Sequence, residues 1–382
     1  MNYDSSYTAL QDWLPKSKKF YQSNRNYDLT GKQTTSRLSS AISSGILSES
    51  EVISSLYAYG ITNSSNKFLE EVFWRIYFRG YFETHPTIWS TYKSQLTIDQ
   101  TELSSDNYQD AINANTGIAC FDDWVSDLIK NGYLHNHTRM WFASIWIFTL
   151  RLPWTLGCDL FMQHLNDADE ASNILSWRWV AGLHTSKKPY VARASNINSF
   201  TNKYNPINQL NESPKPIYEE TNHDFISIDF QKDPITDCNL LMIDNFLDIN
   251  SMNLDTINVE NFYVLDTTDF NERRVDKISI EAKGNIVDKI AKKMNMLPEF
   301  ILLSEISKLK GQTLLSNAIR TGELRDNLIK HLDFINSSSK WYQIYRPIDE
   351  LSWNFCRGGF FKLKTNINAI VNSLLEPSLF SD

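Results

Sequence analysis

The chain has 382 residues, of which 42% are hydrophobic and 21% are charged. This length exceeds one ordinary compact core and predicts two domains. The net charge of −8 argues against a protein that coats nucleic acid non-specifically, because neutralising phosphates requires Lys and Arg. Aromatic residues are abundant, with 11 Trp, 17 Tyr and 21 Phe, so we expect some rings to serve stacking or electron transfer.

The first twenty residues lack the apolar run of a secretory signal. The most apolar run, 140–150, is roughly half as long as a membrane-spanning helix and ends at Arg151, so we expect a buried helix. The four cysteines form no C-x-x-C pair, which predicts neither a zinc site nor a disulfide framework. We therefore expect a cytoplasmic monomer that binds no metal and no membrane.

From Tyr7 to Phe200 the pattern is helical. Apolar residues between Phe121 and Ile129 follow i, i+3, i+4 spacing, and Gly132 then ends this helix. A second amphipathic helix is predicted over 68–81. A third begins after Ser48, a capping residue with Glu51 three positions on.

Composition shifts to Asn, Pro, Lys and Ser between 199 and 223, which is typical of a linker. Beyond it, the runs 225–230, 239–244 and 261–266 predict strands, interleaved with helical stretches such as 285–294. The predicted fold is mainly α: a helical domain over 1–205, a linker over 206–222 and a small α/β, Rossmann-like domain over 223–382.

One helix face carries polar residues suited to a ligand. Asp169, Asn173 and Trp177 follow i, i+4, i+8 spacing, so a carboxylate, an amide and an indole share a face, while Trp179 points nearly the opposite way. Such a face suits a flat heterocycle with a redox partner. The alternative is that Asp167-Ala168-Asp169 caps a helix whose tryptophans are core.

A second candidate face lies at the start of another helix. Asn136, Arg139 and Met140 share it through i+3 and i+4 spacing. The neighbouring His135-Asn136-His137 is not an HNH nuclease signal, because three adjacent helical residues cannot converge on one ion. We expect both histidines to be core or surface residues.

Two weaker patterns remain. The segment Thr35–Ser39 offers hydroxyls and a cation before a helix, as in phosphate cradles, although any serine-rich helix start looks similar. Glu71 and Arg75 at i, i+4 predict an ion pair on a solvated face, or, with Trp74 and Arg79, the mouth of a pocket where a base stacks.

Together these segments resemble the FAD-binding domain of the cryptochrome/photolyase family over about the first 205 residues. TSRLS, the Glu-x-x-Trp-Arg of 71–75, TGIACFDDWV, GYLHNHTRM, ASIWIFTLRLPW and NDADEASNILSWRW fall in register. The resemblance implies an all-helical domain that holds folded FAD, with a DNA lesion flipped into a cavity beside it.

The resemblance also implies roles for individual residues. It implies that FAD is held by Tyr21, Thr35, Ser36, Leu38, Ser39, Phe68, Arg75, Asn136, Arg139, Asp167, Asp169 and Asn173. It implies that the lesion is contacted by Glu71, Trp74, Asn136, Met140 and Trp179. Arg139 would pair with Asp167, and Asn173 would face the flavin N5 nitrogen.

Substrate choice follows from the same resemblance. Asn at 173 is what photolyases use where sensory cryptochromes have Asp or Cys, and Asn136 with Met140 matches enzymes that split cyclobutane pyrimidine dimers rather than (6-4) products. We therefore expect a light-driven repair enzyme acting on ultraviolet-damaged DNA. A (6-4) photolyase and a cryptochrome-like sensor are the alternatives. Arg75, Arg79, Lys187, Lys188 and Arg193 are candidates for a basic rim.

Three departures from the family stand out. Trp177 and Trp154 match the first two members of the photoreduction chain, but the third position falls near Thr101, with Tyr108 as a weak substitute. Phe68 replaces a Trp common beside the flavin. The predicted α/β domain follows the helical domain, whereas photolyases usually carry an α/β antenna domain before it. We expect the α/β domain of this chain to occupy the flank that the antenna domain usually takes. No second chromophore is indicated.

Overall fold

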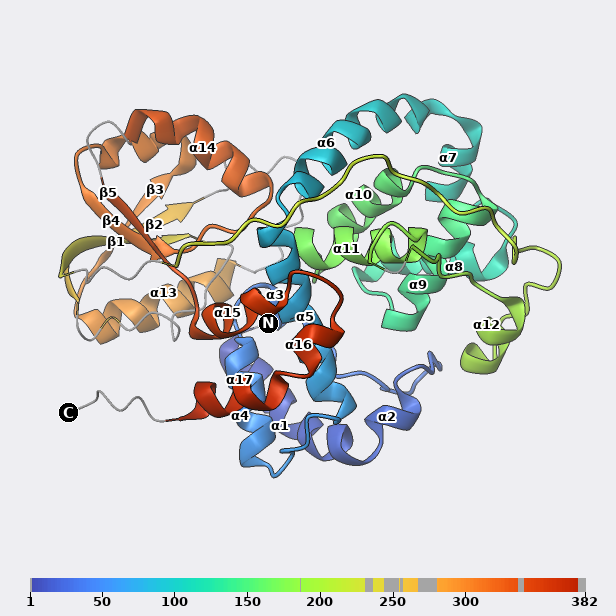
Figure 1. Ribbon diagram of the computed structural model, residues 1–382, viewed down its shortest axis with the longest axis horizontal. Coiled ribbons are helices and arrows are strands. Elements are labelled where there is room, and N and C mark those ends of the chain that lie inside the picture. Colours follow the sequence, from blue (N-terminus) through green and yellow to red (C-terminus); the bar gives the residue numbers. More distant parts are fainter. Residues whose placement is uncertain are drawn as a thin grey trace.

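The computed structural model describes residues 2–185, 187–230, 236–243, 254, 257–266, 280–335 and 340–376. Its first two hundred residues are helical, and the bundle occupies the lower and right parts of Figure 1. The helices of this part are α1 Tyr3–Lys19, α2 Tyr21–Asn24, α3 Ser39–Ser43, α4 Glu49–Ala58, α5 Lys67–Thr84, α6 Thr87–Asp99, α7 Asp106–Ile112, α8 Ala119–Asn131, α9 Asn136–Ser144, α10 Trp154–His164, α11 Glu170–Ala181 and α12 Ala194–Thr201. Short 3-10 and π-helical turns occupy Gln100–Ser104 and Ile145–Thr149.

Local signals set several helix ends where the sequence predicts them. Ser48 caps α4 by accepting from the Glu51 N–H, while the Glu51 carboxylate accepts from the Ser48 N–H at 2.8 Å. Gly132 ends α8 in the left-handed region with φ 63°, where a side chain is disfavoured, and its N–H bonds the Leu128 carbonyl. The predicted helix over 68–81 is α5, which begins at an Asn66 cap.

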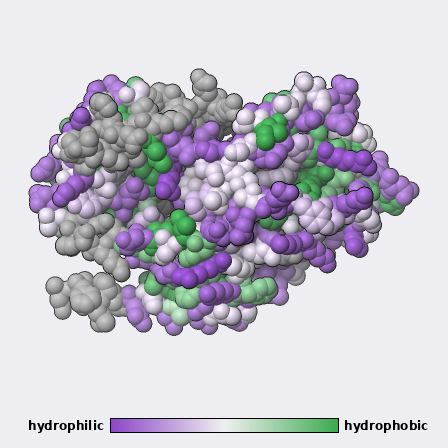
Figure 2. Space-filling view, turned by 45° about the horizontal axis from the view of Figure 1, so that its top comes forward, coloured by the Kyte–Doolittle hydropathy of each residue, from purple (hydrophilic) through white to green (hydrophobic). Residues whose placement is uncertain are grey.

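Most of the apolar run 140–150 is buried, as predicted: residues 141–148 lie buried in the end of α9 and the following π-helical turn. Among the helices that the structure describes, none is long and apolar enough to cross a membrane. On the face shown in Figure 2, hydrophilic residues predominate and the hydrophobic ones gather in small separate groups.

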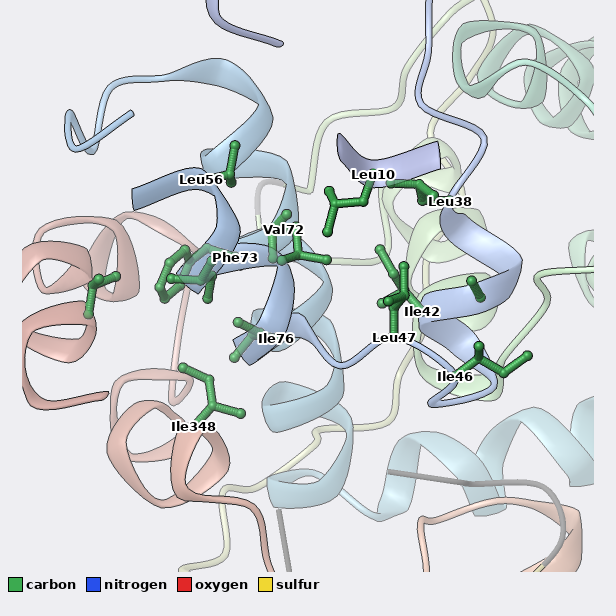
Figure 3. Close-up of a cluster of buried hydrophobic side chains, with 14 of the residues drawn as sticks. Leu10, Leu38, Ile42, Ile46, Leu47, Leu56, Val72, Phe73, Ile76 and Ile348 are labelled. Carbon is green, nitrogen blue, oxygen red and sulfur yellow. The ribbon is translucent and has the colours of Figure 1, made fainter. Parts of the chain in front are cut away.

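Helix α5 runs through the middle of the molecule and contributes to two buried clusters. In Figure 3, Leu10 lies between Leu38 and Val72 of α5, while Ile348 from the far end of the chain lies near Ile76. This cluster also includes residues of the sheet, so both halves of the chain share one hydrophobic core.

The later part holds a five-stranded parallel sheet in the order β3-β2-β1-β4-β5. Its strands are β1 Asp237–Ile243, β2 Asn258–Asp266, β3 Pro298–Leu302, β4 Thr313–Asn317 and β5 Lys340–Ile344, with helices α13 Ile280–Met294 and α14 Glu323–Ile335. This order, with its reversal between β1 and β4, is that of a doubly wound α/β fold. The predicted Rossmann-like parallel sheet is thus confirmed.

Alternation along β1 explains the two layers around the sheet. Leu240 and Met242 join the cluster that contains α13, whereas Leu241 and Ile243 join the cluster that contains Leu328 of α14. Successive side chains of a strand point to opposite faces, so each helix covers one face. Figure 1 shows α14 above the strands and α13 below them.

One predicted strand is wrong. Residues 225–230 have strand-like composition but no regular structure. Ile226 donates to the Thr84 carbonyl at the end of α5, and Phe230 packs against Tyr345 and Trp353. Its aromatic and branched residues are therefore used for packing against helices and not for pairing with another strand.

After β5 the chain returns to the helical part. This return comprises α15 Pro347–Ser352, a 3-10 turn at Trp353–Phe355, α16 Phe361–Lys364 and α17 Ile367–Leu375. A buried contact holds this return to the helical part: Arg346 bonds Glu49 of α4 at 2.5 Å. The segment between β4 and α14 is held as well, because Thr321 Oγ1 donates to Glu83 of α5 at 2.6 Å. The predicted boundaries at 205 and 223 remain predictions.

Candidate functional site

A cavity of about 620 Å³ opens between α5, α9, α11 and the segment that precedes α3. It brings together almost every predicted site residue from five separate stretches of the chain. The predicted residues that line it are Tyr21, Thr35, Ser36, Ser39, Phe68, Glu71, Trp74, Arg75, Asn136, Arg139, Met140, Asp167, Asp169, Asn173, Trp177 and Trp179. Its size is ordinary for a cofactor or small-molecule site.

Two predicted residues lie outside the lining. Leu38 is 1% exposed and packs in the core of Figure 3, so its side chain does not reach the cavity. Trp154 is also buried; its ring contacts Tyr92, with centroids 5.7 Å apart.

The start of α11 both caps the helix and faces the cavity, so the two interpretations that its sequence allows, a ligand face and a helix cap, are both correct. Asp169 is the N-cap, accepting from the Ser172 N–H at 3.0 Å, and Trp177 is buried, yet Asp169, Asn173 and Trp177 all line the cavity. Capping fixes the carboxylate in place while its second oxygen stays at the cavity. Trp179 also lines this cavity, stacked on Tyr190 with centroids 5.5 Å apart.

Arginines neutralise Asp169. Arg79 Nη2 lies 3.0 Å from one carboxylate oxygen, and Arg75 Nη2 lies 3.5 Å from the other. Burial raises the pKa of Asp169, but these two guanidinium groups outweigh it and hold the pKa below its usual range. Arg79 is 5% exposed and also pairs with Glu83, so the expectation that it contributes to a basic rim is wrong.

The predicted pair of Arg139 and Asp167 is present, with 3.0 Å between Arg139 Nη2 and the carboxylate. Burial raises the pKa of Asp167, but Arg139 and the Ser39 hydroxyl outweigh it, so its pKa falls below the usual range. The pair ties α9 to the segment before α11. It therefore sets one wall of the cavity.

Glu71 has different partners from the one its spacing predicts. It accepts from the Tyr21 hydroxyl and from Arg25 Nη1 at 2.7 Å, while Arg75 donates to Ser43 at 2.7 Å. The predicted i, i+4 ion pair between Glu71 and Arg75 does not form, because Glu71 pairs with Arg25 and Arg75 bonds Ser43. Burial raises the pKa of Glu71 above its usual value despite the opposing Tyr21 and Arg25 contacts.

Asn173 is fixed by a single backbone contact. Its Nδ2 donates to the Cys158 carbonyl at 2.8 Å, which orients the amide and leaves Oδ1 as the acceptor available to a ligand. The side chain is 7% exposed and lines the cavity. An acceptor so placed suits a ring N–H.

Four buried polar atoms at the cavity have no hydrogen-bond partner in the part of the chain that the structure describes. They are Arg75 Nε, Asp167 Oδ1, Asp169 Oδ2 and Trp177 Nε1. Buried donors and acceptors are nearly always satisfied in native proteins. The two carboxylate oxygens still lie close to a cation, 3.5 Å from Arg75 Nη2 and 3.0 Å from Arg139 Nη2. The two donors, Arg75 Nε and Trp177 Nε1, have no such contact and therefore indicate a ligand that offers hydrogen-bond acceptors.

The charges that line the cavity also indicate a polar ligand. Its lining includes the acidic Glu71, Asp167 and Asp169 and a larger set of cations: Arg25, Arg37, Lys67, Arg75 and Arg139. A surplus of positive charge favours an anionic ligand, such as a pyrophosphate. The polar groups and charges therefore fit FAD.

Sequence reasoning missed two of these residues, whereas Arg37 is the cation that the Thr35–Ser39 pattern already included. Arg25 and Lys67 carry no local pattern that marks them as ligands. Arg37 lies inside the TSRLS segment, with φ 57° and its guanidinium 4.8 Å from the Tyr133 ring centroid. A left-handed conformation in a residue other than glycine is typical of functional sites.

Both histidines of the 135–137 stretch are structural, as predicted. His135 caps α9, with its Nδ1 accepting from the His137 N–H at 3.2 Å. His137 reaches the cavity wall, but its ring nitrogens contact the Asn26 carbonyl and the Tyr190 hydroxyl. Among the described residues, no group of three or more His, Cys, Asp and Glu is placed to hold a metal ion.

Comparisons with known proteins identify the class of this domain. Residues 68–217 match the family model described as the FAD binding domain of DNA photolyase. Residues 68–217 are therefore similar to the FAD-binding domain that cryptochromes and photolyases share.

Its relatives carry two kinds of name. It is 31% identical over 187 residues to the deoxyribodipyrimidine photo-lyase of Alkalihalophilus pseudofirmus, covering 47% of this chain and 38% of that one. It is 27% identical to the mitochondrial deoxyribodipyrimidine photo-lyase of Saccharomyces cerevisiae, covering 53% and 38%. It is also 27% identical to the cryptochrome DASH of Idiomarina loihiensis, covering 50% and 43%. The chain thus spans about two fifths of the length of these relatives.

Among solved structures, the chain is similar to a class III photolyase from Agrobacterium tumefaciens, with a TM-score of 0.44 and 24% identity over 52% of this chain and 42% of that one. It is also similar to a cryptochrome from Synechocystis, with a TM-score of 0.43 and 22% identity over 52% and 43%. Both TM-scores lie below 0.5.

Proposed function

We propose that this protein is a light-driven repair enzyme that splits cyclobutane pyrimidine dimers in DNA. The main support is that one cavity contains all the residues expected around FAD except Leu38, together with the five expected around a dimer. When bound in its reduced form, FAD supplies the excited-state electron that opens a cyclobutane ring. Such a transfer requires the lesion to lie against the cofactor, and a shared cavity allows this.

The chain's own residues have distinct parts in this proposal. The indole rings of Trp74 and Trp179 stack against the splayed bases, and Asn136 and Glu71 hydrogen-bond their edges. Glu71 is available for this because a carboxylate accepts about four hydrogen bonds, and Tyr21 and Arg25 occupy two. Asn173 Oδ1 would accept from the N5–H of a reduced flavin, since its Nδ2 is already engaged with the Cys158 carbonyl.

We also propose a surface that binds the DNA phosphates on either side of the lesion. Lys187 and Arg193 are exposed on the segment after α11, which continues into Tyr190 of the cavity wall. Exposed cations at a cavity rim attract the phosphate backbone without reading its sequence. Lys188, likewise exposed, extends this rim.

The (6-4) photolyase alternative is less well supported. Repair of that lesion requires a proton donor near the lesion. His137 is the histidine of the lining, and its two nitrogens already contact Asn26 and Tyr190. Burial lowers the pKa of His137, which disfavours the protonated form needed for an acid.

The sensory alternative takes its support from the relative named cryptochrome DASH. Asn173 favours repair over signalling, because the resemblance implies Asn at this position in photolyases and Asp or Cys in sensory cryptochromes. The location in the cell and the oligomeric state remain predictions.

A direct assay tests the proposal. The purified chain, with its flavin chemically reduced, is illuminated with oligonucleotides that carry either a cyclobutane dimer or a (6-4) product. We expect restoration of the dimer substrate alone. Restoration of the (6-4) product would favour the alternative enzyme, restoration of neither would contradict the enzyme proposal, and a chain without flavin would contradict both.

A variant pair separates lesion contact from cofactor binding. Trp179→Ala should lose binding of the dimer oligonucleotide while the absorbance spectrum of bound FAD stays unchanged. Trp341→Ala is the matched control, because Trp341 is also half-buried but lies on β5 of the sheet. Equal loss of binding in the control would show that Trp179 acts only through stability.

A further inference from the structure

The route by which electrons reach Trp177 is incomplete at the position where the family would place its outer aromatic. That position falls near Thr101, which is not aromatic and lies exposed on a 3-10 turn. Trp177 lines the cavity and is 1% exposed, so an electron lost from it must be replaced through the protein.

The rings in contact with Trp177 include an indole that the sequence pattern did not single out. Within the described part of the chain, its ring contacts are Phe142, Trp146 and Phe161. Of these only Trp146 is readily oxidised; its centroid lies 6.4 Å from that of Trp177, at an interplanar angle of 86°. Edge-to-face contact at this separation is a normal packing of aromatic pairs.

A glycine permits this approach. A Cβ built on Gly157 of α10 would lie 2.7 Å from Trp177 Cζ3 and 2.9 Å from Trp146 Nε1. Any side chain there would push the two indoles aside, so Gly157 lets the rings converge.

From Trp146 the path continues to the surface. The ring of Tyr108 on α7 lies 5.9 Å from Trp146, centroid to centroid, at 89°. Tyr108 is half-buried and Trp146 is fully buried. The three rings therefore lead from the cavity wall to the edge of the molecule.

We propose that Tyr108 and Trp146 form an electron-transfer branch that re-reduces Trp177 from the protein surface. This inference depends on the proposed flavin photochemistry of the cavity. It adds Trp146 and Tyr108 to the residues of that function and gives the outer position to Tyr108 instead of Thr101.

Electrostatics favours this branch over the one through Trp154. The Arg178 guanidinium lies 5.9 Å from the Trp154 ring centroid, and its charge, partly offset by Glu219, opposes a tryptophan radical cation there. The cation–ring contacts of the described residues do not include Trp146. At the outer end of the branch, burial and, to a smaller extent, the charge of Asp159 raise the pKa of Tyr108. The negative charge of Asp159 also favours a positive charge that develops on the nearby ring.

The electrons and protons balance along the branch. Trp177 loses one electron toward the flavin and keeps its proton, because its Nε1–H has no acceptor among the described residues. Trp146 gives one electron to Trp177, and Tyr108 gives one to Trp146 while its hydroxyl proton passes to solvent or to Asp159. A thiol reductant in solution then returns one electron and one proton to Tyr108.

Electron paramagnetic resonance identifies the radical at the end of the path. The chain loaded with oxidised FAD is illuminated with blue light without external reductant, frozen and measured, with ring-deuterated tyrosine as the label. We expect a tyrosyl signal in the unaltered chain, its loss in Tyr108→Phe, and its loss in Trp146→Phe. Tyr108→Phe keeps the ring, and unchanged FAD absorbance confirms that the variant is folded.

The matched control is Tyr92→Phe, which removes the hydroxyl of the ring that Trp154 contacts. The tyrosyl signal should survive in this variant. Its persistence in Tyr108→Phe, its loss in Tyr92→Phe, or a tryptophan radical alone in the unaltered chain would overturn the branch. Dimer repair by the chemically reduced chain is measured in parallel, so failure of the branch with repair intact is distinguished from failure of the proposed function.

Discussion

The ring of Phe360 stacks on the ring of Trp74, with centroids 4.1 Å apart and planes 17° apart. Phe360 comes from the segment just before α16, and Trp74 comes from α5 at the cavity wall. Phe360 is 5% exposed, so the stack is buried. One face of Trp74 is thereby occupied by the C-terminal segment, which leaves the opposite face or the edge of the indole for a base.

The stack predicts that the C-terminal segment supports the lesion side of the cavity. Phe360→Ala should lower the free energy of unfolding by about 3 kcal/mol, because it removes a buried aromatic side chain. It should also weaken binding of the dimer oligonucleotide, since Trp74 loses the ring that holds it. Urea denaturation and a binding titration measure the two effects.

Phe361→Ala is the control, because the adjacent ring is 79% exposed. It should change the free energy of unfolding by less than about 0.5 kcal/mol. Comparable destabilisation in both variants would mean that the stack on Trp74 contributes nothing specific.

Gly157 predicts a steric effect on the electron-transfer rings. Gly157→Ala should destabilise the protein by about 2 kcal/mol, because its Cβ would overlap Trp177 and Trp146. Near-ultraviolet circular dichroism should change, since the indoles are displaced. Gly284→Ala in α13 is the control: no atom lies within 4 Å of its Cβ, and alanine should stabilise that helix by about 0.5–1 kcal/mol.

Glu219 predicts a defined dependence of stability on pH. Its carboxylate accepts two hydrogen bonds from Arg178, at 2.8 and 2.5 Å. Burial raises the pKa of Glu219, but the bonds to Arg178 and His223 outweigh burial and lower this pKa to about 2. Because the folded pKa lies below the ordinary value of 4.5, the stabilisation is complete above about pH 5. It is lost as the pH falls from 4.5 toward 2.

Glu219→Gln should therefore cost about 3 kcal/mol at pH 7, and the difference from the unaltered chain should shrink as the pH falls through that window. Glu220→Gln, at the exposed neighbouring position, is the control and should cost little at either pH. Chemical denaturation at a series of pH values measures the difference. A cost for Glu219→Gln that does not vary with pH would contradict the assignment.

The hydrogen bonds of Thr321 hold the sheet region to α5, and we expect them to contribute to the free energy of unfolding. Its hydroxyl and its N–H both bond the Glu83 carboxylate, at 2.6 and 2.8 Å, and all these groups are buried. Thr321→Val should lower the free energy of unfolding by about 2 kcal/mol, because a hydrogen bond to a buried charge is lost. Thr365→Val, whose exposed hydroxyl bonds the Lys362 carbonyl, should be nearly neutral.

The sequence by itself determined features that depend on neighbours a few residues apart. The Ser48–Glu51 capping box, the end of α8 at Gly132 and the shared face of Asp169, Asn173 and Trp177 all follow from helical periodicity and capping. These signals are local, because a helix aligns residues three and four positions apart whatever surrounds it. The match of several segments to one family then predicted the cofactor.

Only the tertiary structure decided which distant side chains meet. Glu71 pairs with Arg25 and not with its helical neighbour Arg75, Trp146 touches Trp177, and the run 225–230 packs on helices instead of forming a strand. Phe360 covers Trp74 from the opposite end of the chain. Such contacts depend on how whole elements pack into one dense core, and no pattern within a single element specifies them.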